Sequence, residues 1–313
     1  MEQRSLGRQG LTTSAIGYGS MGTKMAYGHS DDTASIAAIR HAVELGVTHF
    51  DTAELYGWGE GEKLLGAALA PFRDKVTIGT KFGWTKEFGF NSRPDHIREV
   101  IDASLVNLGV ETIDVLYQHV DDPAVPIEDV VEVMAEYVAA GKAKYLGLSN
   151  TSAENIRRAH AVHPISVMQA EYSIFSRESE ALFPVLDELG IGLVAYSPLA
   201  RGFLSGAVKP GDGYGDGDMR GAAPWWAPEN FDANIAITEQ LTELATSKGA
   251  TLSQLSLAWL LARREDVVPI PGSRSTERVA QNTAAADLKL TEADMARIQE
   301  IAPDGGIGGR VTF

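Results

Sequence analysis

The chain has 313 residues, of which 44% are apolar, with no cysteine and a formal net charge of −15. The length suits two ordinary domains or one large α/β barrel, and the acidic balance argues against nucleic acid or an anionic membrane as the main partner. The lack of cysteine excludes disulfides, a thiolate nucleophile and cysteine-ligated metal. Because neither a leader segment nor an apolar run of about 18 residues is found, we expect a soluble cytoplasmic protein that does not bind membranes.

Strand and helix patterns alternate along the chain after a short hairpin. Gly7 and Gly10, between short apolar pieces, predict that hairpin over residues 4–13, where it would act as a lid. The predicted strands occupy residues 15–19, 47–50, 75–81, 113–119, 145–150, 166–170, 192–196 and 267–270. The predicted helices occupy residues 32–46, 62–70, 94–108, 127–140, 152–161, 178–189, 251–264, 276–286 and 291–301, and Asp32 or Thr33 can cap the first of them.

About eight strand-then-helix units predict parallel strands joined by helical crossovers. Two closures fit this pattern, an open doubly wound sheet and an eight-stranded barrel. The barrel is favoured because the repeat number is near eight and no Gly-x-Gly-x-x-Gly follows the first strand. No low-complexity linker divides the chain, so residues 1–313 are predicted to form a single domain.

Residues 205–234 form the longest irregular stretch, with a run of Gly-Asp pairs followed by Pro-Trp-Trp-Ala-Pro. A loop of this length is usually functional, a lid or disordered. Its clustered aspartates are similar to calcium loops, but the terminal glutamate of that motif is missing. We therefore predict no metal site here.

Polar residues fall where the predicted strands end. Asp51, Lys81 and His119 end three different strands, and Tyr56 lies in the loop just beyond Asp51. In a barrel these strand ends face one common mouth. A phenol becomes a useful proton donor when a cation lies beside it and a carboxylate orients that cation. The four residues would therefore suit reduction of a carbonyl, where the new alkoxide must be protonated as hydride arrives.

Each of these residues taken alone has a structural explanation. A strand-end Asp is often a turn residue or helix cap, and a Lys there is usually solvated. His119 alone would more often be a hydrogen-bonded structural residue, and Tyr56 a packed ring with a wet tip. Their shared position at strand ends favours a functional cluster.

Several segments together carry a family resemblance. They are Phe50-Asp-Thr-Ala-Glu-Leu-Tyr-Gly57, Thr80-Lys81, Leu116-Tyr-Gln-His119, residues 141–150, 169–172 and 195–206, and Ile270-Pro-Gly-Ser-Arg274 with Gln281-Asn282. In this order and spacing, the chain resembles the aldo-keto reductases along nearly its whole length. It is most similar to the bacterial and plant branch that reduces aldehydes and ketones, often aromatic ones.

The resemblance implies an (α/β)8 barrel, or TIM barrel, with an N-terminal hairpin and long loops at the mouth, using NADPH without a metal. By position, Asp51, Tyr56, Lys81 and His119 match the catalytic tetrad of the family. Tyr56 would be the general acid and Lys81 would lower its pKa. Asp51 would pair with Lys81, and His119 would orient the carbonyl.

The resemblance also implies a set of cofactor-binding residues. Ser149, Asn150 and Gln169 match the residues that hold the nicotinamide carboxamide, and Tyr196 matches the ring that stacks on it. The loop along the pyrophosphate contains Ser197, Pro198, Leu199, Arg201 and Gly202. The remaining members are Gly19, Ser20, Met21 and Asp51 and, around the adenosine 2′-phosphate and adenine, Gly272, Ser273, Arg274, Arg278, Gln281 and Asn282.

The choice between NADPH and NADH depends on the last of these segments. Arg274 and Arg278 stand near a predicted helix start, where backbone N–H groups and guanidinium groups suit a phosphate, although a solvated basic helix end would look the same. Many relatives carry Lys where this chain has Gly272, and other branches carry an acidic residue at Gln281. NADPH is therefore expected, with NADH possible but disfavoured.

Apolar and aromatic residues near the predicted mouth are candidates for contact with substrate: Met21, Tyr27, Trp84, Val120, Trp225 and Trp226. Exposed tryptophans on a loop would suit an aromatic or otherwise apolar carbonyl compound. The alternative is that Trp225 and Trp226 anchor the long loop to the barrel.

Three functions are compatible with the sequence. The favoured one is an NADPH-dependent reductase of small aldehydes and ketones. The second is an NADPH-binding interaction subunit, like the channel-associated members of the same family, with little turnover. The third, a metal-dependent barrel hydrolase using Asp51 and His119, lacks the further ligands it would need. The oligomeric state is not predicted.

Overall fold

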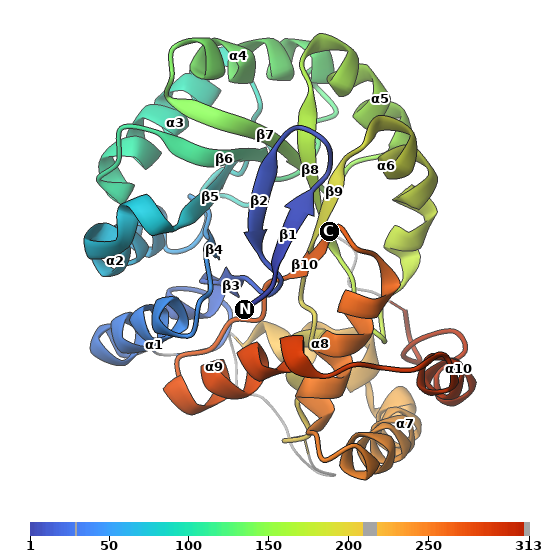
Figure 1. Cartoon of the computed structure of the whole chain (residues 1–313). Coiled ribbons are helices and arrows are strands. Elements are labelled where there is room, and N and C mark those ends of the chain that lie inside the picture. The colour runs from blue at the N-terminus through green and yellow to red at the C-terminus, as the bar shows by residue number, and fades with distance from the viewer. Residues whose placement is uncertain (29, 209–217, 310–313) are drawn as a thin grey trace.

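An eight-stranded parallel barrel ringed by helices forms the centre of the computed structural model, which describes residues 1–28, 30–208 and 218–309 (Figure 1). Each strand pairs with its neighbour in the chain, and the backbone N–H of Gly17 donates to the carbonyl of Pro269 at 2.9 Å, so the first and last strands adjoin. The strands are β3 (Tyr18–Gly19), β4 (His49–Asp51), β5 (Thr77–Phe82), β6 (Ile113–Gln118), β7 (Ala143–Ser149), β8 (Ile165–Glu171), β9 (Gly192–Tyr196) and β10 (Val267–Pro269). The predicted barrel is thus confirmed over the open sheet.

The predicted N-terminal hairpin is also confirmed, and it lies across one end of the barrel (Figure 1). It consists of β1 (Gln3–Leu6) and β2 (Leu11–Ser14). Leu6 and Leu11 are buried in one cluster with side chains of β6, β8, β9 and β10. At the turn, Gly7 has φ 73°, and a Cβ there would stand 2.4 Å from the carbonyl oxygen of Gly190, so only glycine fits. Because Gly190 lies two residues before β9 and Gly192 begins it, the hairpin covers the N-terminal end of that strand.

Within the described ranges, eight helices form a ring around the outside of the barrel, one for each strand (Figure 1). They are α1 (Asp32–Glu44), α2 (Glu60–Leu69), α3 (Pro94–Leu108), α4 (Ile127–Ala139), α5 (Ala153–Val162), α6 (Phe183–Leu189), α8 (Leu252–Arg263) and α9 (Thr276–Thr283). In α3 the predicted signals act as expected, with a proline in the first turn and Gly109 ending the helix at φ 65°. Successive side chains of a strand point to opposite faces, so apolar core residues and polar site residues lie on different sides of the barrel wall. Phe50 packs into the layer between strand and helices, whereas Asp51 points to the barrel interior.

Many element boundaries differ from the prediction by a few residues, and four of these differences concern helix ends. The cap of α1 is Asp31, whose side chain accepts from the backbone of Thr33 and Ala34. The helix predicted over residues 178–189 is a 3-10 turn, η3 (Glu178–Leu182), followed by α6 with Pro184 in its first turn. The helix predicted over residues 276–286 ends at Thr283, where η7 (Ala284–Asp287) begins. The C-terminal helix α10 (Glu292–Ile301) starts one residue later than predicted.

The largest difference concerns the stretch expected to be irregular over residues 205–234. Its described parts contain the end of η4 (Ala200–Ser205), the turns η5 (Met219–Ala222) and η6 (Pro224–Trp226), and the start of a 20-residue helix, α7 (Pro228–Ser247). No helix was predicted there. Helices α7 and α10 lie side by side outside the ring (Figure 1). Residues 209–217, with most of the Gly-Asp pairs, lie outside the described residues.

Two features are absent from the described ranges, a membrane-spanning helix and a cluster of metal-ligating side chains. None of the helices there has both the length and the apolar character needed to cross a membrane. Nor do those ranges contain a group of three or more His, Asp or Glu side chains that could hold a metal ion.

Candidate active site

Asp51, Lys81, Tyr56 and His119 come together at the C-terminal ends of β4, β5 and β6. The Lys81 ammonium donates to Oδ1 of Asp51 at 2.5 Å and to the carbonyl of Thr52 at 2.7 Å. The two charged side chains are only 0% and 2% exposed, so this ion pair is removed from water. Loss of either partner of a buried ion pair is strongly destabilising, because it leaves an uncompensated charge away from water. The geometry therefore fixes one ammonium beside one carboxylate inside the barrel.

The Lys81 ammonium lies between two phenol rings. Its Nζ is 5.2 Å from the ring centroid of Tyr56 and 5.9 Å from that of Tyr117. Tyr117, on β6, is held in place by small neighbours, since a Cβ on Gly147 would come within 2.4 Å of its ring and one on Gly79 within 3.1 Å. These two glycines of β7 and β5 thus make room for a ring that helps to exclude water from Lys81.

The pKa of each site group shifts for a clear reason. Burial raises the pKa of the Tyr56 phenol well above its usual value, and the Asp51 carboxylate adds to this. The Arg201 charge has a smaller, opposite effect on the pKa of Tyr56. Burial lowers the pKa of Lys81, and Asp51 opposes this effect. Burial, followed by the Lys81 charge, lowers the pKa of His119 well below its usual value, so this imidazole is neutral.

His119 directly follows β6 and meets aromatic rings on two sides. Its ring centroid lies 6.2 Å from that of Tyr56 and 6.1 Å from that of Trp84, both edge to face. Its backbone carbonyl accepts from the side-chain amide of Asn150 at 3.0 Å. The imidazole is therefore held beside the Tyr56 phenol by residues from three strand-end segments.

The residues predicted for the nicotinamide end make hydrogen bonds to this cluster in two separate groups. Gln169, at the C-terminal part of β8, donates through Nε2 to Oδ2 of Asp51 at 2.9 Å. The Tyr196 hydroxyl donates to Oδ1 of Asn150 at 2.9 Å, and the amide of Asn150 donates to Oγ of Ser149 at 3.0 Å. These four side chains thus lie around the same mouth although they come from β7, β8 and β9.

The loop after β9 has an unusual backbone. Ser197, Ala200 and Arg201 all have left-handed φ values, of 47°, 47° and 54°, and Asn150 at the end of β7 has φ 50°. Such conformations cost free energy for residues other than glycine and gather at functional sites. Pro198 and Leu199 lie between them, and Gly202 follows at φ 98°. The Arg201 side chain is only 3% exposed, and its guanidinium lies 3.9 Å from the carboxylate of Glu171.

On the opposite side of the mouth, the segment after β10 meets the segment after β3. A Cβ on Gly272 would stand 2.3 Å from the carbonyl oxygen of Gly19, which explains why no lysine occupies this position. Arg274 donates to the carbonyl of Tyr27 at 3.2 Å, and the carbonyl of Ser273 accepts from Tyr18. In α9, Arg278 is exposed in the first turn, Gln281 is half-buried and Asn282 is buried.

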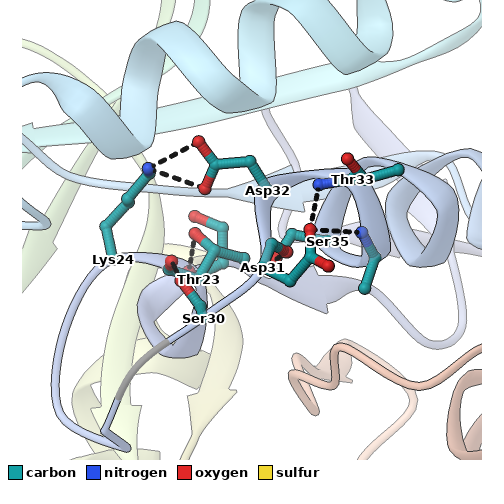
Figure 2. A network of polar contacts seen from close by, with 9 residues as sticks. Thr23, Lys24, Ser30, Asp31, Asp32, Thr33 and Ser35 are labelled. Atoms are coloured by element: carbon teal, nitrogen blue, oxygen red, sulfur yellow. Dashed lines mark hydrogen bonds and ion pairs between the residues drawn. The ribbon is translucent and has the colours of Figure 1, made fainter.

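The β3 loop, which carries Ser20, Met21 and Tyr27, is fastened at the start of α1 (Figure 2). The Lys24 ammonium donates to both carboxylate oxygens of Asp32, at 2.7 and 2.9 Å. The hydroxyl of Ser30 donates to the carbonyl of Thr23, and Asp31 caps the helix. At the other end of this loop, Oγ of Ser20 is buried without a hydrogen-bond partner among the described residues. An unused polar group beside Asp51 fits a site built for a ligand.

The predicted substrate residues fall into two sets. Met21 and Trp84 pack against the small apolar cluster that contains Tyr56, Tyr27 is half-buried in the β3 loop, and Val120 follows His119. Trp225 and Trp226, which were expected to be exposed, are 0% and 9% exposed. They pack against Phe175, Phe203 and Phe231, so the expectation of exposed indoles is wrong. These two rings anchor the long loop, which is the alternative that the sequence left open.

The sequence reasoning missed two residues beside the cluster. Tyr117 lies two residues before His119, and residues with this spacing on a strand point to the same face. The spacing could therefore have identified Tyr117 as a neighbour of the cluster. Glu54 lies between Asp51 and Tyr56, and its side chain accepts from the backbone N–H groups of Gly83 and Trp84. No sequence pattern signals such a contact, because any residue can supply the backbone donors.

Known proteins are similar to this chain over most of its length. The sequence model of the Aldo/keto reductase family matches residues 15–303. An aldo-keto reductase of Schizosaccharomyces pombe whose name includes NADP(+) is 39% identical over 309 residues, covering 95% of this chain and 91% of that protein. A probable aldo-keto reductase of Glycine max is 41% identical over 311 residues, covering 97% of this chain and 90% of that protein.

Solved structures have the same fold. A glycerol dehydrogenase of Gluconobacter oxydans superposes with a TM-score of 0.89 at 26% identity, over 99% of this chain and 98% of that one. An aldo-keto reductase of Klebsiella pneumoniae, solved in complex with NADPH, gives a TM-score of 0.78 at 25% identity over the whole of both chains. With a family match over most of its length and relatives near 40% identity, the chain belongs to the Aldo/keto reductase family.

Proposed function

We propose that the chain reduces aldehydes and ketones to alcohols with NADPH, using Tyr56 as the proton donor. The observation that carries the proposal is the buried cluster in which Lys81, paired with Asp51, lies beside the Tyr56 ring while neutral His119 faces it. The relatives support the cofactor, since the Schizosaccharomyces pombe protein is named for NADP(+) and the Klebsiella pneumoniae protein was solved with NADPH.

In this mechanism the bound reduced nicotinamide would supply hydride to the carbonyl carbon. Burial keeps the Tyr56 hydroxyl protonated until the developing alkoxide, a much stronger base, takes its proton. The Lys81 ammonium then offsets the charge that forms on the phenolate, and Asp51 keeps that ammonium in place. His119, being neutral, can donate a hydrogen bond to the carbonyl oxygen and so fix its position.

The cofactor residues are proposed on the same basis. Ser149, Asn150, Gln169 and Tyr196 would hold and stack the nicotinamide end, because their polar groups gather around Asp51 and His119. The left-handed loop from Ser197 to Gly202 would follow the pyrophosphate. Arg274, Arg278 and the start of α9 would take the 2′-phosphate, which favours NADPH over NADH. Further proposed contacts are Gly19, Ser20, Met21, Gly272, Ser273, Gln281 and Asn282.

The substrate class is proposed from the walls of the mouth. Met21, Tyr27, Trp84 and Val120 offer apolar and aromatic surface near Tyr56, which suits an aromatic or otherwise apolar carbonyl compound. Trp225 and Trp226 are left out because they are used in packing. We also propose a single domain, since the described segments from both ends of the chain pack around one barrel.

The test is a fluorescence titration of the purified protein with NADPH and separately with NADH, followed by turnover of a panel of aromatic and aliphatic aldehydes. Tight NADPH binding with turnover of an aryl aldehyde is the expected result. Tight binding without turnover would favour an interaction subunit of the same fold. If neither nucleotide binds, the proposed cofactor site is wrong.

A single substitution tests the proton donor. Tyr56→Phe should reduce kcat about 10²- to 10⁴-fold, because general acid catalysis contributes that much, while the Kd for NADPH changes little. The matched control is Tyr145→Phe, since the Tyr145 hydroxyl bonds the carbonyl of Gly10 in the hairpin, far from the mouth. Full activity of the Tyr56→Phe protein would refute the assignment.

A further inference from the structure

A second cleft lies outside the proposed active site, between α2, α3 and the segment that follows β5. Its volume is about 300 Å³, which is within the range of sites for small organic ligands. The indole rings of Trp58 and Trp84 and the side chain of Val100 supply apolar wall. Asp51, Tyr56, Lys81 and His119 do not line it. The cleft is therefore a separate cavity that shares Trp84 with the mouth.

Glu54 lines this cleft with one carboxylate oxygen fixed and the other unused. The whole residue is only 9% exposed. Its Oε1 accepts from the backbone N–H groups of Gly83 at 2.8 Å and Trp84 at 3.1 Å. Within the described ranges, Oε2 makes no hydrogen bond. This oxygen is not itself fully buried, so a positive group that enters the cleft can reach it.

The other charged groups of the cleft leave it negative. Glu62 is already satisfied, because it accepts from Thr80 at 2.6 Å and from Asn107 at 3.1 Å. The remaining titratable side chains that line the cleft are Lys86, Glu87, His96 and Glu99. Apart from His96, four carboxylates face one lysine. Burial, with a smaller contribution from Glu62, raises the pKa of Glu54 to about 7, so Glu54 carries its charge in mildly basic solution.

We propose that this cleft binds a small organic cation, an ammonium compound with a compact aromatic body. The cation would lie at Oε2 of Glu54, the carboxylate oxygen that no hydrogen bond within the described ranges uses. The aromatic body would lie between Trp58 and Trp84, whose ring faces also attract a cation. An anionic ligand is disfavoured by the surplus of carboxylates, and a neutral ligand would leave the charge of Glu54 without a counter-ion.

Occupancy of the cleft is coupled to the proposed active site through Trp84. The backbone N–H of Trp84 is held by Glu54, and its ring meets the His119 ring edge to face at a centroid distance of 6.1 Å. A ligand packed on Trp84 therefore touches the residue that supports His119. This consequence for turnover rests on the proposed function, whereas binding of the cation does not.

The binding test uses benzyltrimethylammonium as the probe, because its charge does not depend on pH and it cannot condense with a carbonyl compound. Calorimetric titration of the full chain at about pH 8, above the pKa of Glu54, should show saturable binding. Glu54→Gln should weaken it at least tenfold, since glutamine keeps the acceptor for Gly83 and Trp84 but removes the charge. Glu132→Gln, which removes one exposed charge on α4, should leave the affinity unchanged.

A second variant keeps the test decisive if Glu54→Gln fails to fold. Val100→Arg places a guanidinium at the cleft wall and should abolish binding of the probe, whereas neopentylbenzene, its uncharged analogue, should not bind the unmodified chain. The proposal is overturned if the probe does not bind, if Glu54→Gln binds it equally well, or if a carbonyl substrate displaces it competitively. Binding is measured without NADPH, so failure of the proposed function would leave this result intact.

Discussion

The ammonium of Lys81 and the carboxylate of Asp51 share a site from which water is excluded, and each depends on the other. Lys81→Met should lower the free energy of unfolding by about 3–5 kcal/mol, because it leaves a buried carboxylate without its partner. The double variant Asp51→Leu with Lys81→Met should recover much of this loss while remaining inactive. Chemical denaturation with urea measures both.

The control is an ion pair on the protein surface, where both side chains are exposed to water. Lys142 and Asp102 lie 3.0 Å apart with side chains 47% and 57% exposed. Lys142→Met should therefore cost less than about 1 kcal/mol. If Lys81→Met were as mild as Lys142→Met, the ammonium would not be buried as described.

Glu54 predicts a pH dependence of stability. Its pKa is raised from 4.5 to about 7 by burial, so between these values the folded chain binds more protons than the unfolded chain. The stabilising contribution of protonated Glu54 is complete below about pH 4.5 and is lost as the pH rises through about 7. Relative to Glu54→Gln, the unmodified chain should lose up to about 1.4 kcal/mol per pH unit within this window. Parallel stability curves of the two proteins would contradict the shift.

At the scale of elements, the sequence predicted best where a local signal marks an end. Helix α3 has the predicted bounds because Pro94 and Gly109 fix its two ends. Helix α7 was missed although Pro228 stands in its first turn, because that proline ends a glycine- and proline-rich stretch that indicates a loop. The burial of Trp225 and Trp226 could not be predicted from the sequence, since it depends on rings from the loops after β8 and β9 and from α7.

The candidate site was predictable in its strand-end members and not in their partners. Asp51, Lys81 and His119 were placed together because parallel strands end at one mouth. The contact of Gln169 with Asp51 joins residues 118 positions apart and depends on the side-chain conformations of both. The same holds for Glu54, whose partners are backbone N–H groups.

The pairing of β6 with β7 places Tyr117 opposite Gly147, and this register should limit what Gly147 can become. Gly147→Ala puts a methyl group 2.4 Å from the Tyr117 ring and should cost about 1–3 kcal/mol of stability. Adding Tyr117→Leu should relieve the overlap and restore part of the loss. Gly89→Ala, where the new Cβ would be 3.4 Å from Thr85, is the near-neutral control. Equal stability of the two alanine variants would show that the ring is free to move.

At the scale of the whole molecule, the hairpin joins the two ends of the barrel sheet. The Arg4 guanidinium donates to the carbonyls of Leu261, Arg264 and Val267 at 3.0, 2.9 and 3.3 Å. Strand β1 of the hairpin therefore holds the chain around β10. These bonds span more than 250 positions and supplement the Gly17–Pro269 contact that adjoins β3 and β10. The hairpin is therefore a clamp on barrel closure as well as a cover.

Removing this clamp should loosen the last strand selectively. Arg4→Ala should lower the free energy of unfolding by at least about 2 kcal/mol, because hydrogen bonds from a charged donor are worth more than neutral ones. Hydrogen exchange should accelerate most in β10. Arg4→Lys should recover only part of the loss, since an ammonium cannot reproduce the three-way geometry of the guanidinium.

The control for the clamp lies four residues along the hairpin. Arg8 is exposed and makes one long side-chain bond, 3.5 Å to the carbonyl of Asp187. Arg8→Ala removes the same charge and should cost under about 0.5 kcal/mol, as surface substitutions usually do. Equal losses for Arg4→Ala and Arg8→Ala would mean that net charge, and not the three carbonyl contacts, is what the hairpin contributes to closure of the barrel.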